Sequence, residues 1–342
     1  MIKYFSTTST QQKISWEEEL NRFRDANLFQ SDAYRLDNHS KTTHLFRSFL
    51  VEDSKVVSMA QGKIVIIPII KVACLFLRGG PVFHSSSSEK NNNKNLKIHL
   101  QKIKEDLSSN FNIWYLNIVL YDDRDVSVEI VLREAGLTRP QIERDPYLTS
   151  IATIKQDSNE NLMLLDSKWR NQLRKAEKQR LLFTFGSDQN LLKRYTILHN
   201  EMSDIKKLKN ISITGQRREL LINTLGESLQ VLVCSDGKND FCGCVIGLYG
   251  TKSYYIYAAA NELGRANCYS NAMVWELLDI LRKRNINELD LMGLDPVNNW
   301  GSYNFKKGIG GKLVASVGEW EAASNKAIKL VLNIALYWKI KK

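Results

Sequence analysis

A lysine beside an aromatic residue, Phe305-Lys306, is the pair in this sequence whose residue types could most directly do chemistry. It lies between a turn-rich segment, 293–301, and the glycine-rich run Gly308-Ile309-Gly310-Gly311. Glycine lets a backbone come close to a ligand, and a lysine ordered by a neighbouring ring can place positive charge where negative charge develops in a transition state. The pattern predicts the rim of a pocket, although an exposed loop with a solvated lysine has the same composition.

Periodicity predicts the elements that must position this pair. Residues 288–291 alternate between polar and apolar, which indicates a strand, and residues 271–284 form an amphipathic helix before it. Further helices are expected at 16–26, 96–110, 127–136, 162–180, 189–202, 216–225 and 327–342, and strands at 45–51, 55–61, 63–77, 112–119, 148–154, 229–235, 241–249 and 253–259. This alternation is typical of an α/β fold, and two tandem copies of one fold suit it better than two unrelated domains.

A basic helix in the middle of the chain is a second candidate for chemistry. Residues 168–180 carry six cations, offset by one acid, Glu177. Arg170 and Arg174 are four residues apart, so one face of the helix repeats positive charge, which costs helix stability and indicates that an external anion relieves it. A solvated face above a buried stripe of Trp169 and Leu173 is the alternative reading.

Together these segments resemble the Fem family, the non-ribosomal aminoacyltransferases that build peptidoglycan cross-bridges from aminoacyl-tRNA. The strand end Asp290-Leu291-Met292-Gly293, followed by a loop and Phe305-Lys306-Lys307-Gly308-Ile309-Gly310, is similar to the closing signature of that family. Residues 168–178 are similar to its basic helix. Two weaker likenesses are the early segment Gln30-Ser31-Asp32-Ala33-Tyr34 and the Gly80-Pro81-Val82 ending.

The resemblance implies an α/β fold of two tandem domains that are similar to acyl-CoA N-acyltransferases of the GNAT type. The first domain would cover residues 1–148, with residues 318–342 returning to it, and the second would cover residues 149–317 with the catalytic loop. The long coiled-coil arm of some family members is not expected, because the second half of the chain contains no heptad run.

The resemblance also implies roles for single residues. Lys306 would stabilise the oxyanion that forms when a substrate amine attacks the ester of aminoacyl-tRNA, and Phe305 would pack against the substrate and keep the lysine ordered. The ester is already activated, so no enzyme nucleophile is needed. Substrate contacts would come from Tyr257, Arg217, Tyr34 and Asp290, and tRNA contacts from Arg170, Arg174 and Lys175.

Several points of this site stay open at the level of sequence. Tyr255 and Tyr257 should share one face of their strand, where they line a pocket or fill a core. We expect Asp290 to support the strand end rather than to act as a base. The proton of the attacking amine could pass to Asp295, to Glu319 or to a substrate phosphate, so no general base is assigned.

The acceptor and a rival donor also stay open. Residues 35–38 lack the lysine that family members use to bind a nucleotide-linked peptidoglycan precursor, so an amino sugar of a surface polysaccharide is equally expected as the amine of the cell-envelope precursor. The precursor would be nucleotide- or lipid-linked. The alternative is an acyl-CoA-dependent N-acyltransferase with acetyl-CoA as donor, but residues 262–268, read from Glu262, lack the Gly spacing of a pyrophosphate loop.

Composition sets the broad limits. The chain has 342 residues, which suits two domains, and a formal net charge of +11, which favours an anionic partner such as nucleic acid, lipid or a phosphorylated carrier. The five cysteines show no metal-site spacing, and neither a metal nor a cofactor besides the donor is expected. The N-terminus has no apolar run of secretory length, so a cytoplasmic protein is expected. Residues 327–342 would dock on the first domain or lie at the inner membrane face.

Overall fold

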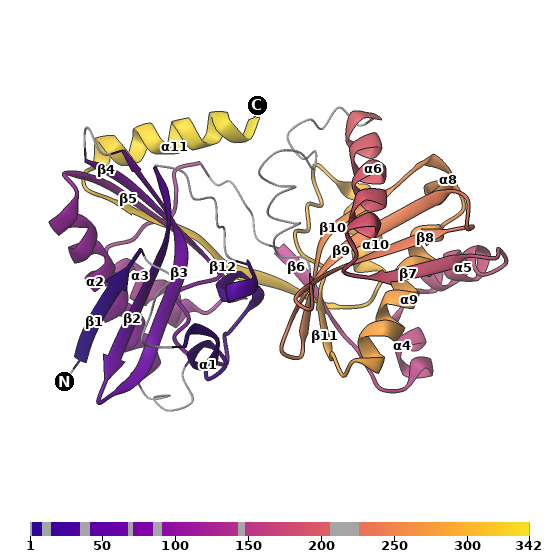
Figure 1. Cartoon of the computed structure of the whole chain (residues 1–342), viewed down its shortest axis with the longest axis horizontal. Coiled ribbons are helices and arrows are strands. Elements are labelled where there is room, and N and C mark those ends of the chain that lie inside the picture. Colours follow the sequence, from indigo (N-terminus) through magenta and orange to yellow (C-terminus); the bar gives the residue numbers. More distant parts are fainter. Residues whose placement is uncertain are drawn as a thin grey trace. The chain divides into compact units, whose positions relative to one another are not determined.

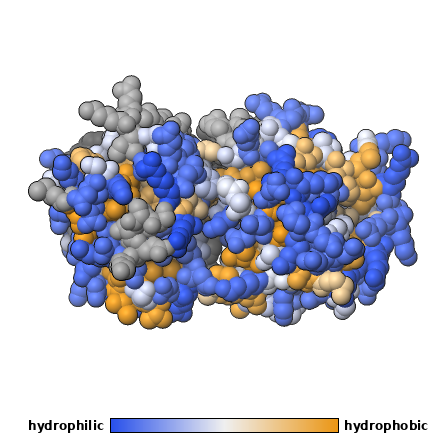
Figure 2. All heavy atoms as spheres, turned by 90° about the horizontal axis from the view of Figure 1, so that it is seen from below, coloured by the Kyte–Doolittle hydropathy of each residue, from blue (hydrophilic) through white to orange (hydrophobic). Residues whose placement is uncertain are grey.

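The computed structural model describes residues 2–8, 15–34, 42–67, 71–84, 91–142, 148–205 and 226–341. It divides into two compact units. Unit 1 comprises residues 1–147 and 315–342, and unit 2 comprises residues 148–314. The sequence-based boundaries were placed after residues 148 and 317. On the face seen in Figure 2, hydrophilic side chains predominate, with apolar residues in patches between them.

Unit 1 is a six-stranded sheet with helices (Figure 1). Its strands, in sheet order, are β1 (Ile2–Thr7), β2 (Thr43–Glu52), β3 (Lys55–Ile67), β4 (Val72–Arg78), β5 (Ile113–Asp123) and β12 (Lys312–Ala323). β4 and β5 are parallel, and the other pairs are antiparallel. The described helices are α1 (Trp16–Leu20), α2 (Asn92–Asn110), α3 (Val126–Glu134) and α11 (Lys326–Lys341), with the 3-10 turns η1 (Leu28–Gln30) and η2 (Asp32–Tyr34).

The two faces of the unit 1 sheet differ in chemistry. Alternate residues of β5 and β12, among them Leu116 and Trp320, join α2 and α3 in one apolar core. The residues between them are polar: the Tyr115 hydroxyl donates to Glu321, and the Asn117 amide donates to Glu319 over 2.7 Å. Since successive side chains of a strand point to opposite faces, the second face is polar where β5 and β12 meet.

Unit 2 repeats this plan. Its strands, in sheet order, are β6 (Leu148–Thr153), β11 (Glu288–Asp290), β10 (Lys252–Ala260), β9 (Asp240–Tyr249), β8 (Leu229–Ser235) and β7 (Leu182–Gly186). β10 and β11 are parallel, and the other pairs are antiparallel. The described helices are α4 (Ser158–Leu164), α5 (Ser167–Ala176), α6 (Gln189–Ile205), α8 (Glu262–Ala266), α9 (Tyr269–Lys283) and α10 (Trp300–Lys307).

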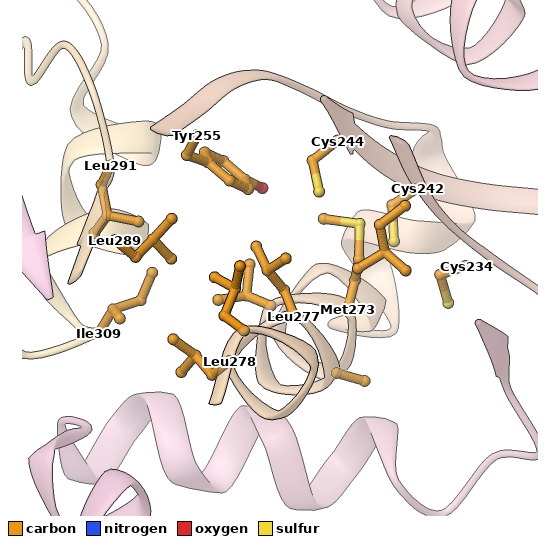
Figure 3. Close-up of a cluster of buried hydrophobic side chains, with 14 of the residues drawn as sticks. Cys234, Cys242, Cys244, Tyr255, Met273, Leu277, Leu278, Leu289, Leu291 and Ile309 are labelled. Carbon is orange, nitrogen blue, oxygen red and sulfur yellow. The ribbon is translucent and has the colours of Figure 1, made fainter. Parts of the chain in front are cut away.

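Unit 2 has an apolar core on each face of its sheet. One core contains α5 and α9, and Figure 3 shows Tyr255 of β10 pointing into it toward Leu277 and Cys244. The other core packs α6 against β8, β9 and β10. The described cysteines are free thiols, and burial raises the pKa of Cys74 to about 11. They are therefore small packing groups rather than reactive ones.

Most predicted elements are present, but several differ. The helix predicted over 16–26 is the shorter α1. The strand predicted over 63–77 is the end of β3 and the separate strand β4. The single helix predicted over 162–180 is two helices, because Leu165 and Asp166 have extended backbone between α4 and α5. β1, β7, α8, α10 and β12 were not predicted. The helix predicted over 216–225 lies outside the described residues.

Candidate functional site

A pocket of about 860 Å³ opens in unit 2 where the parallel strands β10 and β11 separate. Their pairing ends at Tyr254 and Asp290, and β10, still paired with β9 on its other side, continues along the pocket to Ala260. The opposite wall is formed by α10, with α5 and the start of α9 completing the pocket. We call it the β10 pocket. Its charged lining residues in the described part of the chain are Asp166, Lys168, Arg265, Lys306 and Lys307. Four cations against one carboxylate make it suitable for an anionic ligand.

Lys306 lies on this wall, as the sequence predicted for a pocket rim. Its Nζ donates to the carbonyl oxygens of Met292 at 2.6 Å and Gly293 at 2.9 Å. An ammonium has three N–H donors, so one remains for a ligand oxygen. Burial lowers the pKa of Lys306 to about 8, and the nearby Asp290 carboxylate partly opposes that shift. The lysine is therefore held in a fixed position with a weakly hydrated charge, as an oxyanion donor requires.

Asp290 fixes the loop whose carbonyl oxygens bind Lys306. Its Oδ1 accepts hydrogen bonds from the Thr149 hydroxyl and, at 2.8 Å, from the Met292 amide. Met292 has a left-handed backbone with φ of 52°, an uncommon conformation for a residue with a side chain. Burial raises the pKa of Asp290. Asp290 does not appear among the described residues that line the pocket, so we place it behind the wall as support for the strand end.

Phe305 has a different contact from the one expected. We expected the ring to pack against substrate, and it does line the β10 pocket. Within the protein it packs against Trp169 of α5, with ring centroids 5.9 Å apart. Gly308 lies on the same indole, since a Cβ there would come within 2.7 Å of it. Phe305 thus fixes α10 on α5 and, with it, the backbone that carries Lys306.

The glycines after Lys306 serve the fold rather than a ligand. A Cβ on Gly310 would lie 1.9 Å from the carbonyl oxygen of Leu164, and one on Gly311 would lie 2.4 Å from the Ser150 hydroxyl. Gly310 also has a φ of +82°. The close approach that these glycines permit is that of the chain to its own α4 and β6.

Tyr257 lines the β10 pocket, but it does not share a face with Tyr255. A β-bulge interrupts the pairing of β10 with β9 between these two residues. An extra residue in a strand reverses the alternation that follows it. Tyr255 therefore points into the core with α9, and Tyr257 packs on the other side, edge-on to His199 of α6 at 6.0 Å. The expected common face was wrong for this reason.

The basic helix contributes to the pocket through different residues from those expected. Lys168 and Gln172 of α5 line the β10 pocket. Arg170 instead donates to the carbonyl oxygen of Leu165, and Lys175 donates to that of Ala266 at 2.7 Å. Arg174 is exposed and bonds Asn171 at 3.2 Å. Lys168 and Gln172 are four residues apart and therefore share one face of the helix, which is a signal that the sequence offers. The sequence-based prediction instead chose Arg170 and Arg174 for their charge.

The segment that follows β10 bears on the acyl-CoA alternative. Counted from Asn261, the segment reads Asn-x-x-Gly-x-Ala. A pyrophosphate loop has the pattern Arg/Gln-x-x-Gly-x-Gly/Ala, so only the first position of the segment departs from it. The sequence-based comparison, which began at Glu262, was one residue out of register. Several of its amides are already occupied: Gly264 donates to the Asn261 side chain at 2.9 Å, and Arg265 and Cys268 donate to carbonyls within the segment. Gly264 is needed because a Cβ would meet the Phe241 carbonyl at 2.5 Å.

Tyr34 lies in unit 1, on a pocket of about 230 Å³ with an aromatic lining and one cation, Arg78. We call it the Tyr34 pocket. Its other lining residues are Phe29, Leu45, Gln61, Gly62, Phe76 and Tyr121. Phe29 packs edge-on to Tyr34 at 5.1 Å. Such a lining suits a planar or anionic part of a ligand.

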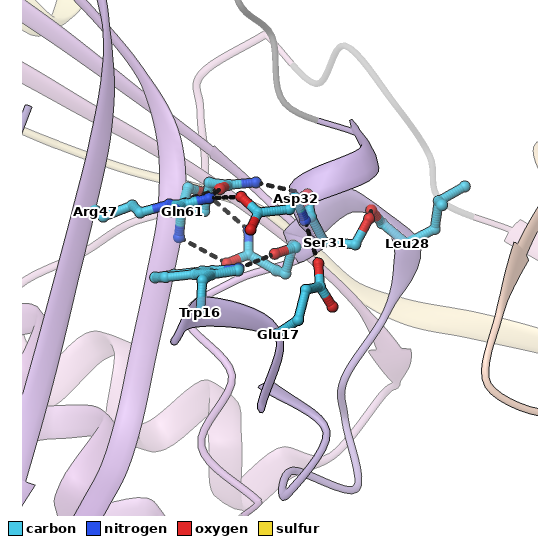
Figure 4. Close-up of polar contacts among 8 residues, drawn as sticks. Trp16, Glu17, Leu28, Ser31, Asp32, Arg47 and Gln61 are labelled. Carbon is cyan, nitrogen blue, oxygen red and sulfur yellow. Dashed lines mark hydrogen bonds and ion pairs between the residues drawn. The ribbon is translucent and has the colours of Figure 1, made fainter. Parts of the chain in front are cut away.

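A polar network explains the sequence before Tyr34 (Figure 4). The Gln30 amide bonds both the carbonyl and the amide of Gln61, and the Gln61 side chain donates to the Ser31 carbonyl at 2.9 Å. Arg47 bonds Gln61 and Asp32, and it lies 4.4 Å from the centre of the Trp16 ring. Gln30 and Ser31 therefore position the aromatic residue rather than contact a ligand.

Arg217, the expected phosphate contact, lies outside the described residues. Within the described ranges, no cluster of histidine, cysteine or carboxylate side chains could hold a metal ion. Of the two remaining proton acceptors considered, Asp295 is bound by the backbone amides of Val297 and Asn298, and Glu319 is buried against Asn117 in unit 1.

Comparison with solved structures identifies the fold. The structure described as FemX aligns with 94% of this chain and 99% of its own, with a TM-score of 0.77 and 16% identity. A tandem GNAT protein from the clavulanic acid biosynthesis pathway aligns over 95% and 99%, with a TM-score of 0.55 and 8% identity. This chain has the tandem GNAT-like fold. The predicted α/β fold class is therefore confirmed.

A third solved structure shares the tandem GNAT-like fold. It is the C-terminal domain of a putative lysylphosphatidylglycerol synthetase from Agrobacterium fabrum, which covers 94% of this chain and 97% of its own, with a TM-score of 0.58 and 11% identity. Neither the family models nor the curated proteins gave a match to the sequence. In the described part of the chain, no helix is long and apolar enough to cross a bilayer.

Proposed function

We propose that this protein is an aminoacyltransferase that moves an amino acid from aminoacyl-tRNA to an amine of a cell-envelope precursor. The observation that carries the proposal is Lys306, held by two backbone carbonyls on the wall of a basic pocket. FemX has the same fold, and the lysylphosphatidylglycerol synthetase by its name makes an aminoacylated lipid. An aminoacyl group is therefore the cargo that we propose for a pocket of this fold and charge.

The chemistry joins an amine to an activated ester. The substrate nitrogen attacks the carbonyl carbon, an amide C–N bond forms, and the C–O bond to the tRNA ribose breaks. The proton lost by the nitrogen ends on the leaving oxygen, and we assign its transfer to no side chain. The remaining N–H of Lys306 would bond the carbonyl oxygen as it becomes negative. Asp290 would act as a positioning residue through the Met292 and Gly293 loop.

The donor would bind through its phosphates. Lys168 and Lys307 line the β10 pocket, and Arg174 is exposed on the same helix as Lys168. We propose that these cations contact the 3′ end of the tRNA and that Tyr257 contacts the aminoacyl group. Arg170 and Lys175 hold neighbouring loops instead, so their part is structural.

The Tyr34 pocket is a second candidate binding site, and it lies within unit 1. Four aromatic rings beside Arg78 suit a nucleobase or sugar next to a phosphate. The labelled product of a transfer assay identifies the carrier of the acceptor as a nucleotide or a lipid. Peptidoglycan peptide and amino sugar are the two amine classes that we propose.

An acyl-CoA N-acyltransferase is the second candidate. Residues 255–260 of β10 have no strand partner on the pocket side within the described residues, and an open edge can bond the amides of an extended donor. The solved structure of the tandem GNAT protein is described as being without AcCoA, and we take acetyl-CoA as the donor of this alternative. Against this reading, the amides of Gly264, Arg265 and Cys268 are already bonded within their own segment.

Direct binding separates the two donors. We expect labelled tRNA to bind the protein in fluorescence anisotropy, with an affinity that falls as salt rises because phosphate contacts release counterions. Calorimetry with acetyl-CoA should give no binding heat. Saturable binding of acetyl-CoA without binding of tRNA would replace the proposed donor and leave the fold unchanged.

A further inference from the structure

The last helix of the chain docks on unit 1 through both apolar and polar residues. Asn333 of α11 donates from Nδ2 to both carboxylate oxygens of Glu321, at 2.6 and 2.7 Å, and Lys329 lies 3.5 Å from the same group. Glu321 is fully buried, and the Tyr115 hydroxyl donates to it at 2.6 Å. Figure 1 shows α11 as the yellow helix beside β4 and β5. It covers the polar face of the sheet, opposite the core with α2 and α3.

The side of α11 that faces away from the sheet is also apolar. Ile328, Lys329, Leu332, Asn333 and Leu336 face the sheet and are buried or partly buried. On the opposite side of the helix, large apolar side chains are exposed: Leu330 (46%), Val331 (59%), Ile334 (42%) and Trp338 (59%). We call these four residues the outer stripe. A surface helix of a soluble domain normally buries such a stripe, and contiguous exposed apolar patches mark interaction sites.

The composition of the segment that carries the outer stripe indicates what covers it. The sequence from 326 to 342 contains five lysines and no acidic residue, and Lys326 is exposed. A helix with an apolar stripe, lysines and a tryptophan fits the boundary between the headgroups and the acyl chains of an anionic bilayer. A second copy of the same helix would bring lysines against lysines, which opposes pairing.

We propose that α11 binds the surface of an anionic lipid bilayer, with the outer stripe inserted among the headgroups and the positive net charge of residues 326–342 attracting the segment to the anionic lipid. The helix lies in the interface and does not cross the membrane, which agrees with its length and composition. This surface is independent of the β10 pocket. It would bring the protein to acceptors that are carried on lipid.

Vesicle sedimentation tests the proposal with the full chain. The probes are vesicles of phosphatidylcholine with about one third phosphatidylglycerol, and vesicles of phosphatidylcholine alone. We expect binding to the anionic vesicles that weakens at high salt, and at least about tenfold weaker binding of V331D/I334D, because aspartate is strongly disfavoured below the headgroups. Trp338→Ser should also weaken binding. Neither change touches the Glu321 contact, so both variants should fold.

A matched control comes from the same unit. Val126 (68% exposed) and Ile130 (52% exposed) lie on α3, and V126D/I130D makes the same change of residue types away from α11. This variant should bind vesicles as the unaltered protein does. Equal loss in both double variants, or none in V331D/I334D, would overturn the proposal, and so would no binding of the unaltered protein.

Analytical ultracentrifugation covers the rival occupant. A dimer of the unaltered protein that V331D/I334D dissociates would replace the lipid surface with a second copy. A monomer for every variant is the expected result. None of these measurements needs an acyl donor, so their outcome is separate from that of the proposed transfer.

Discussion

Lys306 combines two properties that a solvated surface lysine lacks. It is fixed by the carbonyls of Met292 and Gly293, and burial lowers its pKa to about 8. Asp290 belongs to the same arrangement, because its carboxylate binds the Met292 amide and thereby orients the loop. The chemistry of the site therefore depends on a backbone turn as much as on the lysine itself.

The pH dependence of transfer follows from this pKa. Because the ammonium form donates to the oxyanion, kcat/KM should fall as the pH rises through about 8, where Lys306 loses its proton. In Lys306→Arg the guanidinium stays charged, so this alkaline limb should disappear even though the rate is lower. Initial rates between pH 6.5 and about 9.5, corrected for spontaneous ester hydrolysis, measure it. An unchanged limb in Lys306→Arg would assign the titration to another group.

The same shift has a consequence for stability. The folded-state pKa of Lys306 lies below its ordinary value of 10.5, so the folded protein binds this proton less tightly than the unfolded chain does. The cost is fully present below pH 8 and disappears as the pH rises toward 10.5. Replacing this lysine by an uncharged residue should therefore not unfold the protein at neutral pH.

At the scale of elements, α5 and α10 build the pocket wall together. Trp169 and Phe305 join the two helices, and the Asp166 amide bonds the Gly308 carbonyl at 2.9 Å. Lys168 lies on this wall, whereas Arg170 is turned back to the loop before α5. A charge on a helix contributes to a site only if the helix presents it there.

One lysine variant and one arginine variant test which cations of α5 contact the tRNA. Lys168→Ala should weaken tRNA binding severalfold and lower the slope of log affinity against log salt by about one phosphate contact. Arg170→Ala should leave that slope unchanged and lower the free energy of unfolding by about 1 kcal/mol, since it removes a bond to a backbone carbonyl. Anisotropy titrations and urea melts give both quantities. A reduced slope in Arg170→Ala alone would restore the sequence-based assignment.

The glycines of this region make a second element-scale prediction. Gly310→Ala should destabilise the protein by at least about 2 kcal/mol, because its Cβ meets the Leu164 carbonyl and its backbone is left-handed. Gly301→Ala is the matched control, since nothing lies within 4 Å of a Cβ there and the residue is helical. It should be neutral or stabilising. Equal urea midpoints for the two variants would contradict the role given to Gly310.

How far the sequence predicted these elements depends on local signals. The hairpin of β8 and β9 was predicted because Asp236 and Gly237 form a strong turn signal. α10 was missed because Asn299 and Gly301 indicate a loop, while the helix depends on packing of Phe305 against a residue far away in the sequence. The bulge after Tyr255 has no sequence signal that we recognised, and it decides which tyrosine reaches α9.

At the scale of the whole chain, one plan is used twice with different sites. Each unit has a parallel strand pair joined by a helix, β4 and β5 in unit 1 and β10 and β11 in unit 2. Unit 2 contains Lys306 and the basic pocket, and unit 1 contains the aromatic Tyr34 pocket. The net charge of +11 suits a nucleic-acid donor and an anionic membrane surface alike.

The return of the chain end to unit 1 can be measured through Asn333. Asn333→Leu leaves α11 in place but removes both amide bonds to the buried Glu321 carboxylate, which should cost about 2 kcal/mol of unfolding free energy. Ile334→Leu, a change on the outer stripe of the same helix, is the control and should have no comparable effect. An unchanged urea midpoint in Asn333→Leu would mean that α11 does not depend on this contact.

Transfer of label from aminoacyl-tRNA tests the central claim most directly. The protein is incubated with total tRNA charged with labelled amino acids and with a cell extract that contains membranes and sugar nucleotides. We expect label to enter an extract component through an amide bond, and the rate to fall at least about 100-fold in Lys306→Ala but not in Lys238→Ala, an exposed lysine of the β8–β9 turn. Full transfer by Lys306→Ala, or transfer from acetyl-CoA alone, would contradict the account.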